Sequence, residues 1–237
     1  IEHAFITNSG EAVKMKSAAF LKKLGEADAQ GIIEAIAAGT IKGKGGVYYD
    51  GKGYRYLKSD GTDVKSQWIK EGSRQYYFGS DGYALKWSQK IGGSWYYFNG
   101  SGVMQTGWVT WKDGTKSFFD WDGKALLGWR SFQGRKCYFD PATGISKRWS
   151  QKIDGAWYYF DGDSFMHKGL LTWSSDGRKS YYASDGRLQG GWQTVNGKRY
   201  YFDWSDGKSL RWSQKIGGAW YYFDGDSVMH KGLLTWS

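Results

Sequence analysis

Two different patterns of apolar and polar positions divide the sequence near residue 43. From Glu11 to about Ala38, apolar residues return about every 3.6 positions, which predicts a helical segment. The apolar run IEHAFI, residues 1–6, predicts one short buried strand before it. From about Gly45 onward the pattern changes to short aromatic runs separated by glycine-containing turns, which predicts β-strands.

The second pattern is an internal repeat of about 21 residues. The spacing places these tryptophans in one slot, together with Leu170 and Leu233: Trp68, Trp87, Trp108, Trp129, Trp149, Trp192 and Trp212. Each segment holds an aromatic cluster such as WYYF, followed by an Asp-Gly or Asn-Gly turn signal. An aromatic run, such a turn and a second short run predict a β-hairpin.

A longer period of about 63 residues is also present. The stretch RWSQKIDGAWYYFDGDSFMHKGLLTWS, residues 148–174, returns at residues 211–237 with two changes, and a looser version starts at Lys86. In a strand, Trp157 and Tyr159 share one face while Tyr158 and Phe160 share the other. We therefore expect stacked hairpins that bury one aromatic face and leave the other to line grooves between neighbours.

Composition and charge narrow the class of protein. Glycine contributes 36 of 237 residues and aromatic residues 19%, far from ordinary globular usage. Residues 1–43 contain five lysines and five acidic residues, so the net charge of +10 belongs to the repeats. A basic surface attracts polyanions. Because no nucleic-acid motif is present, an anionic cell-surface polymer fits. No apolar run is long enough to span a membrane. The lone Cys137 cannot form an internal disulfide, and it is interpreted as filler without a chemical role.

The segment from Trp87 to Trp108, WSQKIGGSWYYFNGSGVMQTGW, resembles the choline-binding and glucan-binding type of cell-wall-binding repeat. The resemblance covers residues 45–237 and implies a mainly β fold, a solenoid of stacked hairpins that hold ligands between neighbours. The Trp-Tyr-Tyr motif is intact only at Trp95, Trp157 and Trp220. Other segments replace its tryptophan with Gln75, Ser117, Lys136, Ser180 or Arg199.

The predicted ligand-binding residues belong to the three segments that keep this motif. They are Trp87, Trp95, Tyr97, Met104 and Trp108; Trp149, Trp157, Tyr159 and Met166; and Trp212, Trp220, Tyr222 and Met229. Two aromatic rings on one strand face suit a quaternary ammonium through cation–π attraction, or a sugar ring through stacking. The alternative is that these rings are buried core.

The N-terminal stretch resembles the C-terminal end of zinc-dependent N-acetylmuramoyl-L-alanine amidases. Its residues 1–36 read IEHAFITNSGEAVKMKSAAFLKKLGEADAQGIIEAI, and the family's catalytic glutamate maps onto Glu2. The resemblance implies that residues 1–43 are left over from an α/β catalytic domain, with the repeat domain at residues 44–237. The family's zinc ligands would lie upstream of Ile1, and His3, His167 and His230 are not expected to replace them. We therefore expect no metal or cofactor in this chain, zinc in the complete parent enzyme, and no activity from this chain alone.

Three functions are weighed for the chain. The favoured prediction is a module that anchors a secreted peptidoglycan hydrolase, an amidase, to a polymer of the bacterial cell wall. That polymer would be teichoic-acid-like, choline-bearing or glucan. The second is a glucan-binding repeat region of an extracellular glycan-active protein or adhesin. The third is a structural spacer whose aromatic residues only form core.

Overall fold

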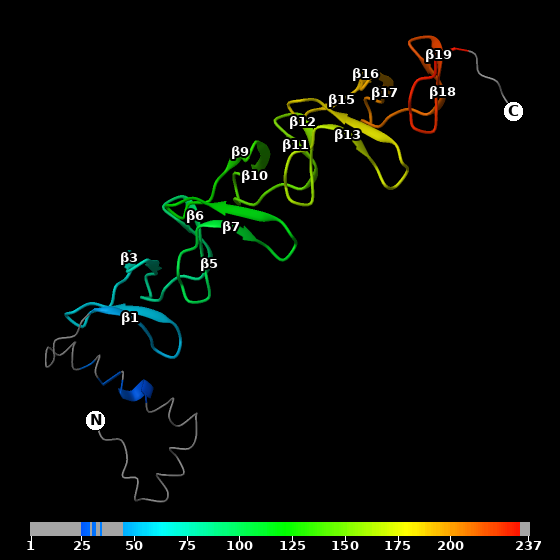
Figure 1. Cartoon of the computed structure of the whole chain (residues 1–237). Coiled ribbons are helices and arrows are strands. Elements are labelled where there is room, and N and C mark those ends of the chain that lie inside the picture. The colour runs from blue at the N-terminus through cyan, green and yellow to red at the C-terminus, as the bar shows by residue number, and fades with distance from the viewer. Residues whose placement is uncertain (1–24, 29, 32–33, 35–44, 233–237) are drawn as a thin grey trace, which may run out of the picture. The chain divides into compact units, whose positions relative to one another are not determined.

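The computed structural model describes residues 25–28, 30–31, 34 and 45–232 (Figure 1). Residues 25–28, 30–31 and 34 are helical. The remainder of the predicted helical segment lies outside the described residues, as do the strand at residues 1–6 and Glu2. The division at residues 43 and 44 therefore stays a prediction.

From residue 45 onward the fold is built from antiparallel β-hairpins, as the repeat predicts. The first hairpins are β1 (Gly46–Tyr49) with β2 (Tyr54–Leu57), β3 (Gln67–Glu71) with β4 (Arg74–Phe78), β5 (Trp87–Ile91) with β6 (Ser94–Phe98), and β7 (Gly107–Thr110) with β8 (Lys116–Phe119). The later hairpins are β9 (Gly128–Phe132) with β10 (Arg135–Phe139), β11 (Trp149–Ile153) with β12 (Ala156–Phe160), β16 (Gly191–Val195) with β17 (Lys198–Phe202), and β18 (Trp212–Ile216) with β19 (Ala219–Phe223). Between β12 and β16, a three-stranded sheet contains β13 (Gly169–Thr172), β14 (Lys179–Tyr182) and β15 (Leu188–Gln189).

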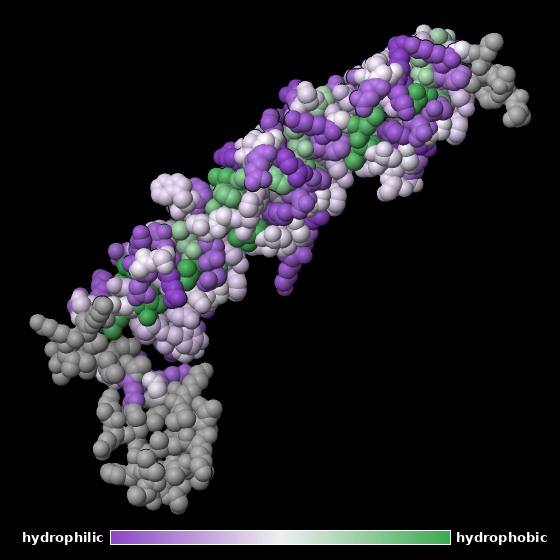
Figure 2. All heavy atoms as spheres, viewed as in Figure 1, coloured by the Kyte–Doolittle hydropathy of each residue, from purple (hydrophilic) through white to green (hydrophobic). Residues whose placement is uncertain are grey.

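The chain forms two compact units. The first contains Ile1–Gly107 and Phe119–Ala125, and the second contains Trp108–Phe118 and Leu126–Ser237. Hydrophilic residues cover much of the visible face of the hairpins, with separate hydrophobic patches between them (Figure 2). In the described part of the chain, no helix is long and apolar enough to cross a membrane.

The turn that closes each hairpin lies before the aromatic run, not after it. In β11 and β12, Ile153 pairs with Ala156, so the loop is Asp154-Gly155 with φ values of 48° and 81°. Two positive φ values define the type I′ turn that suits the twist of a hairpin. The turn downstream of the aromatic run leads only to a single bridge between Phe160 and Met166. The prediction that the downstream turn joins the two strands was therefore wrong.

The register of pairing also corrects the proposed tryptophan series. Trp129 pairs with Tyr138 and Trp192 pairs with Tyr201, so these tryptophans share one slot. Trp149 instead pairs with Phe160, one position earlier in the hairpin. Trp87 and Trp212 pair in the same shifted way with Phe98 and Phe223. A one-residue shift moves a side chain to the other face of a strand, so Trp87, Trp149 and Trp212 are not equivalent to the other tryptophans.

The core contains the phenylalanine residues that end the second strand of most hairpins. These are fully buried: Phe78, Phe98, Phe139, Phe160, Phe202 and Phe223. Successive hairpins are joined by the segment that follows each second strand. The N–H of Met166 donates to Lys136 O of the preceding hairpin at 2.7 Å, and that of His167 donates to Tyr159 O of its own hairpin, also at 2.7 Å. The hairpin of β11 and β12 is thereby tied to the hairpin of β9 and β10, as expected for repeats that are stabilised by their neighbours.

Candidate functional site: an aromatic box in the second unit

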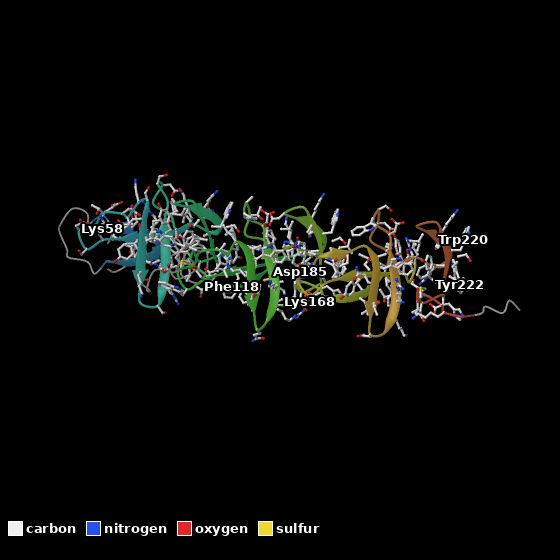
Figure 3. All side chains as sticks on the ribbon, turned by 90° about the horizontal axis from the view of Figure 1, so that it is seen from above. Lys58, Phe118, Lys168, Asp185, Trp220 and Tyr222 are labelled. Carbon is white, nitrogen blue, oxygen red and sulfur yellow. The ribbon has the colours of Figure 1, made fainter. Side chains whose placement is uncertain are left out.

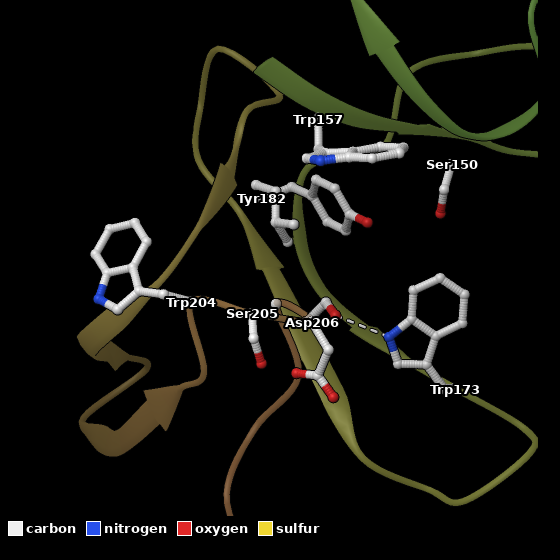
Figure 4. Close-up of a pocket in the computed structure, with 10 residues that line it drawn as sticks. Ser150, Trp157, Trp173, Tyr182, Trp204, Ser205 and Asp206 are labelled. Carbon is white, nitrogen blue, oxygen red and sulfur yellow. Dashed lines mark hydrogen bonds between the residues drawn. The ribbon is translucent and has the colours of Figure 1, made fainter. Parts of the chain in front are cut away.

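Three aromatic side chains from successive strands of the second unit surround one cavity. We call Trp157, Trp173 and Tyr182 the aromatic box. Trp157 is the second residue of β12, Trp173 directly follows β13, and Tyr182 ends β14. The cavity has a volume of about 250 Å³ and is also lined by Trp204 and Asp206. Figure 4 shows Trp157 above Tyr182, with Trp173 on one side and Trp204 on the other.

Hydrogen bonds and ring contacts fix the orientation of the box. The indole Nε1 of Trp173 donates to Ser180 Oγ at 2.8 Å. The ring of Tyr182 is buried and lies edge-on to the ring of His167 at a centroid distance of 5.8 Å. Tyr159 lies behind the box, with its ring edge-on to Trp173 at a centroid distance of 5.7 Å. Because these partners already hold the rings, little side-chain entropy is lost when a ligand enters.

The electrostatics of the cavity combine aromatic faces with a carboxylate. Asp206 lies at the rim, where its Oδ2 accepts from Arg178 Nη1 at 3.1 Å. Lys208 Nζ lies 5.5 Å from the ring centroid of Trp173, and Asp176 Oδ2 accepts from it at 3.1 Å. Burial raises the pKa of Tyr182 to about 12, so this hydroxyl is neutral at physiological pH. The box is therefore an uncharged aromatic cavity whose rim carries the ion pair between Asp206 and Arg178.

The structure separates the residues that were predicted to form a site around Trp157. Trp157 lines the cavity and is 48% exposed. Tyr159 supports the box without lining it, and its pKa is raised by burial. Trp149 lies 6.2 Å from Tyr159 between ring centroids, outside the cavity. Met166 is buried among Ile153, Tyr158 and Phe160, because the single bridge to Phe160 turns it into the core.

The corresponding residues of the other two segments lie on the hairpins of β5 with β6 and of β18 with β19. In the first unit, Lys90 Nζ lies 5.9 Å from the ring centroid of Trp95, and Tyr97 stacks on Phe119 at 6.1 Å. Met104 packs against Gly123, where a Cβ would collide with its sulfur. In the last hairpin, Trp220 and Tyr222 extend from β19 (Figure 3), and Trp220 is 70% exposed. The counterpart of Trp173 in that repeat, residue 236, lies outside the described residues.

Two further predicted residues have other surroundings. Trp108 packs on Phe132 at a centroid distance of 4.6 Å and also contacts Phe118, Phe139 and Phe165. Met229 lines a cavity of about 630 Å³ with Trp192 and Arg199. The guanidinium of Arg199 lies 4.3 Å from the ring centroid of Trp192. In this hairpin a cation of the chain itself therefore occupies an aromatic face.

Sequence reasoning missed Trp173, Tyr182, Trp204 and Asp206. A signal for Trp173 exists, because the repeated sequence ends in LLTWS, and its tryptophan returns with the long period. Tyr182 has the position that phenylalanine fills in most hairpins. His167 is placed as a support, with its ring edge-on to Tyr182 at 5.8 Å. The described residues contain no group of His, Cys, Asp and Glu suited to a metal ion.

Comparison with protein families gives a direct result for the repeats. Residues 88–127 and 188–227 match the choline-binding repeat, and residues 66–84 and 151–163 match the putative cell wall binding repeat. The chain carries choline-binding-type repeats. The second of the 40-residue matches includes Trp204 and Asp206, and the 13-residue match includes Trp157.

Solved structures show the same fold. Choline binding protein F from Streptococcus pneumoniae is 20% identical and covers 75% of this chain and 70% of its own, with a TM-score of 0.63. The structure of CbpF in complex with ipratropium is 25% identical over 76% of this chain and 64% of its own, with a TM-score of 0.58.

Curated relatives of a second kind are similar over shorter stretches. Glucosyltransferase-S from Streptococcus mutans is 34% identical in an alignment of 97 positions that covers 31% of this chain and 6% of that protein. Glucosyltransferase-S from Streptococcus downei is 36% identical over 64 residues, which is 26% of this chain and 5% of that protein. The chain therefore spans only a small part of the length of these relatives.

Proposed function

We propose that the chain is a cell-wall-binding module that binds a quaternary ammonium group, of the choline type, in the aromatic box. The observation that carries this proposal is the arrangement of Trp157, Trp173 and Tyr182 around one cavity. Aromatic faces attract a cation by about 0.5–2 kcal/mol per ring, more when the cation is desolvated. The Asp206 carboxylate lies at the rim as the ion-pair partner of Arg178, so its charge is expected to add only a small further attraction for a positive ligand. Choline-type repeats in the sequence support the same ligand.

The wall polymer is proposed to be held by several such sites of one chain at once. The segments with Trp95 and Trp220 carry the same Trp-Tyr-Tyr motif as the box segment. Weak sites on one chain bind a repeating polymer by multivalent attachment, because a first contact raises the local concentration for the next. The positive net charge of +10 favours approach to an anionic, teichoic-acid-like polymer.

The test is a titration of the full chain with choline, followed by the indole N–H resonances in ¹H–¹⁵N spectra. The Trp173 signal, assigned with Trp173→Phe, is expected to shift in a saturable way. Trp173→Ala should weaken binding at this box by about two- to thirtyfold, the range that one lost cation–π contact gives. An unchanged Trp173 resonance at saturating choline would rule out the box as the site.

A matched control removes a different exposed indole. Trp121 is 85% exposed and is no part of the aromatic box. Trp121→Ala should leave the choline-dependent shift of Trp173 unaltered. Binding to purified walls, and its release by free choline, then tests whether the same site holds the polymer.

A glucan-binding region of a larger extracellular protein is the second candidate function. The observation that favours it is the similarity to the two glucosyltransferases. If dextran perturbs the Trp173 resonance and choline does not, the box binds sugar and this second function replaces the first.

We further propose that the module anchors a secreted peptidoglycan hydrolase and that its hairpins continue as one β-solenoid. The support is the resemblance of residues 1–36 to the end of an amidase, with Glu2 at the catalytic position. Zinc would then belong to the complete enzyme, and this chain alone should not cleave muropeptides. Joined to an upstream amidase region, the chain should cleave them, and Glu2→Ala should abolish that cleavage. Small-angle scattering tests the solenoid.

A further inference from the structure

Trp149 and Trp212 occupy a backbone conformation that sister hairpins reserve for glycine. Their φ values are 61° and 63°, in the left-handed region. Gly128 and Gly191, which pair with the same phenylalanine slot in β9 and β16, have φ values of 70° and 71°. A left-handed φ is uncommon for a bulky residue and is costly where glycine would fit without strain. The first unit repeats the feature at Trp87, with φ of 63°.

Burial does not explain these strained tryptophans. Trp149 is 52% exposed and Trp212 is 57% exposed, so neither indole contributes a full core contact. Each ring passes over the glycine of the next turn, with its Cη2 3.9 Å from the Cβ position of Gly162 and 3.8 Å from that of Gly225. The Arg148 guanidinium lies 4.8 Å from the ring centroid of Trp149, and the rings of Tyr159 and Tyr222 lie 6.2 and 6.5 Å from those of Trp149 and Trp212. Local strain that persists with so little burial is a reason to look for a functional role.

The surroundings of the two tryptophans are built in the same way. Arg148 Nη1 donates to Asp113 O at 2.6 Å, and Arg211 Nη1 donates to Asp176 O at 2.9 Å. The Gln151 amide donates to the backbone oxygen of Arg148 at 2.8 Å. The Gln214 amide donates to Arg211 O, also at 2.8 Å. An indole with a fixed arginine and a fixed glutamine beside it therefore recurs within the second unit.

At Trp212 these groups line a cavity of about 310 Å³. Its other walls include the Asp176 carboxylate and the Arg178 guanidinium, which are joined by an ion pair at 3.0 Å. The volume lies at the lower end for small-ligand pockets. None of its lining residues lines the aromatic box. The cavity combines one flat apolar wall with carboxylate, guanidinium and amide groups.

We propose that Trp149 and Trp212 are stacking platforms for hexopyranose rings of a glycan, at sites distinct from the aromatic box. A pyranose has an apolar face of C–H groups that packs on an indole, and hydroxyls that both donate and accept hydrogen bonds at its edge. Asp176, Arg178 and Gln214 supply the matching acceptors and donors. A choline-type cation fits this site less well, because Arg211 and Arg178 place positive charge there. The repeats would then hold a wall or extracellular polysaccharide through separate sugar and ammonium sites.

The test uses the full chain with Trp149→Gly and Trp212→Gly combined. Glycine is the residue of the sister hairpins, so the strain is removed and the melting temperature should be unchanged or higher. The probes are isomaltoheptaose, for a glucan, and chitotetraose, for an amino-sugar strand. Calorimetry should show binding of at least one probe to the parent chain and at least a tenfold loss in the variant. The probe that binds identifies the source of the sugar.

Choline keeps this test separate from the function proposed for the box. The choline-dependent shift of the Trp173 resonance should survive in the glycine variant, and saturating choline should not displace the sugar. Absence of sugar binding to the parent chain, or equal binding to the variant, overturns the proposal. A second variant, Trp149→Asn with Trp212→Asn, is a control because asparagine also tolerates this φ. If both the glycine and the asparagine variant unfold, the indoles are structural and the proposal is overturned.

Discussion

The indole of Trp173 donates a hydrogen bond to the buried Ser180 Oγ, and Trp111 donates to Ser117 Oγ in the same way at 3.0 Å. The serine therefore sets the angle at which the indole faces the box. Ser180→Ala should lower the free energy of unfolding by about 1 kcal/mol, the usual value for one hydrogen bond. It should also weaken choline binding at the box, because the ring is no longer fixed. Calorimetry and denaturant unfolding measure the two effects.

Ser184→Ala provides the control for this prediction. Ser184 lies in the exposed turn after β14, so its loss should change neither stability nor binding. Equal choline affinity in Ser180→Ala and Ser184→Ala would show that the hydrogen bond does not position the indole.

The two faces of β12 should respond differently to truncation. Phe160 is fully buried, and Phe160→Ala should cost about 3–5 kcal/mol in the stability of its hairpin and neighbours. Trp157 is 48% exposed, so Trp157→Ala should cost clearly less while it weakens choline binding. Thermal unfolding of both variants, followed by far-ultraviolet circular dichroism, makes the comparison. A larger loss for Trp157→Ala than for Phe160→Ala would mean that this indole is core.

Much of the fold could be predicted from the sequence because the repeat spacing and strand alternation are strong signals. Tyr158 and Phe160 are buried while Trp157 is exposed, as alternation along one strand requires. The turn that joins the two strands could not be predicted correctly because a glycine-containing turn lies on each side of the aromatic run. Both turns have residues that are typical of β-hairpin loops. Composition does not decide between Asp154-Gly155 and Asp161-Gly162. Only the paired residues show which of the two joins long strands.

The site was harder to predict because register decides it. A spacing of about 21 residues does not distinguish Trp149 from Trp129, yet one position separates their slots. The box also needs Tyr182 from a later segment, where the sequence SYYA lacks the Trp-Tyr-Tyr motif. Backbone hydrogen bonds from a connecting segment to the preceding hairpin, such as Met166 N to Lys136 O, decide which rings of neighbouring segments meet. Sequence periodicity does not predict these hydrogen bonds.

High pH should destabilise the fold through Tyr182. Its pKa is raised from 10.0 to about 12 by burial, so the unfolded chain loses this proton before the folded chain does. The contribution of Tyr182 to the free energy of unfolding is therefore fully present below pH 10. It falls by on the order of 2–3 kcal/mol as the pH rises toward 12. Tyr182→Phe removes the titrating group, so its melting temperature should fall less over this interval. A parallel fall in both chains would assign the effect to other groups, such as Tyr48 or Cys137, whose pKa values are also raised.

The carboxylate of Asp206 should favour a positively charged ligand over a neutral ligand of the same shape. Asp206→Asn keeps the size of the side chain and removes a rim charge that is 41% exposed, so choline affinity should fall by no more than about fivefold. The loss should shrink at high salt, because screening already weakens the attraction in the parent chain. The neutral isostere 3,3-dimethyl-1-butanol fills the same volume without a charge, and its affinity should be the same in both chains. If Asp206→Asn weakens the neutral alcohol as much as choline, the side chain acts by shaping the cavity, and the charge contributes nothing to recognition.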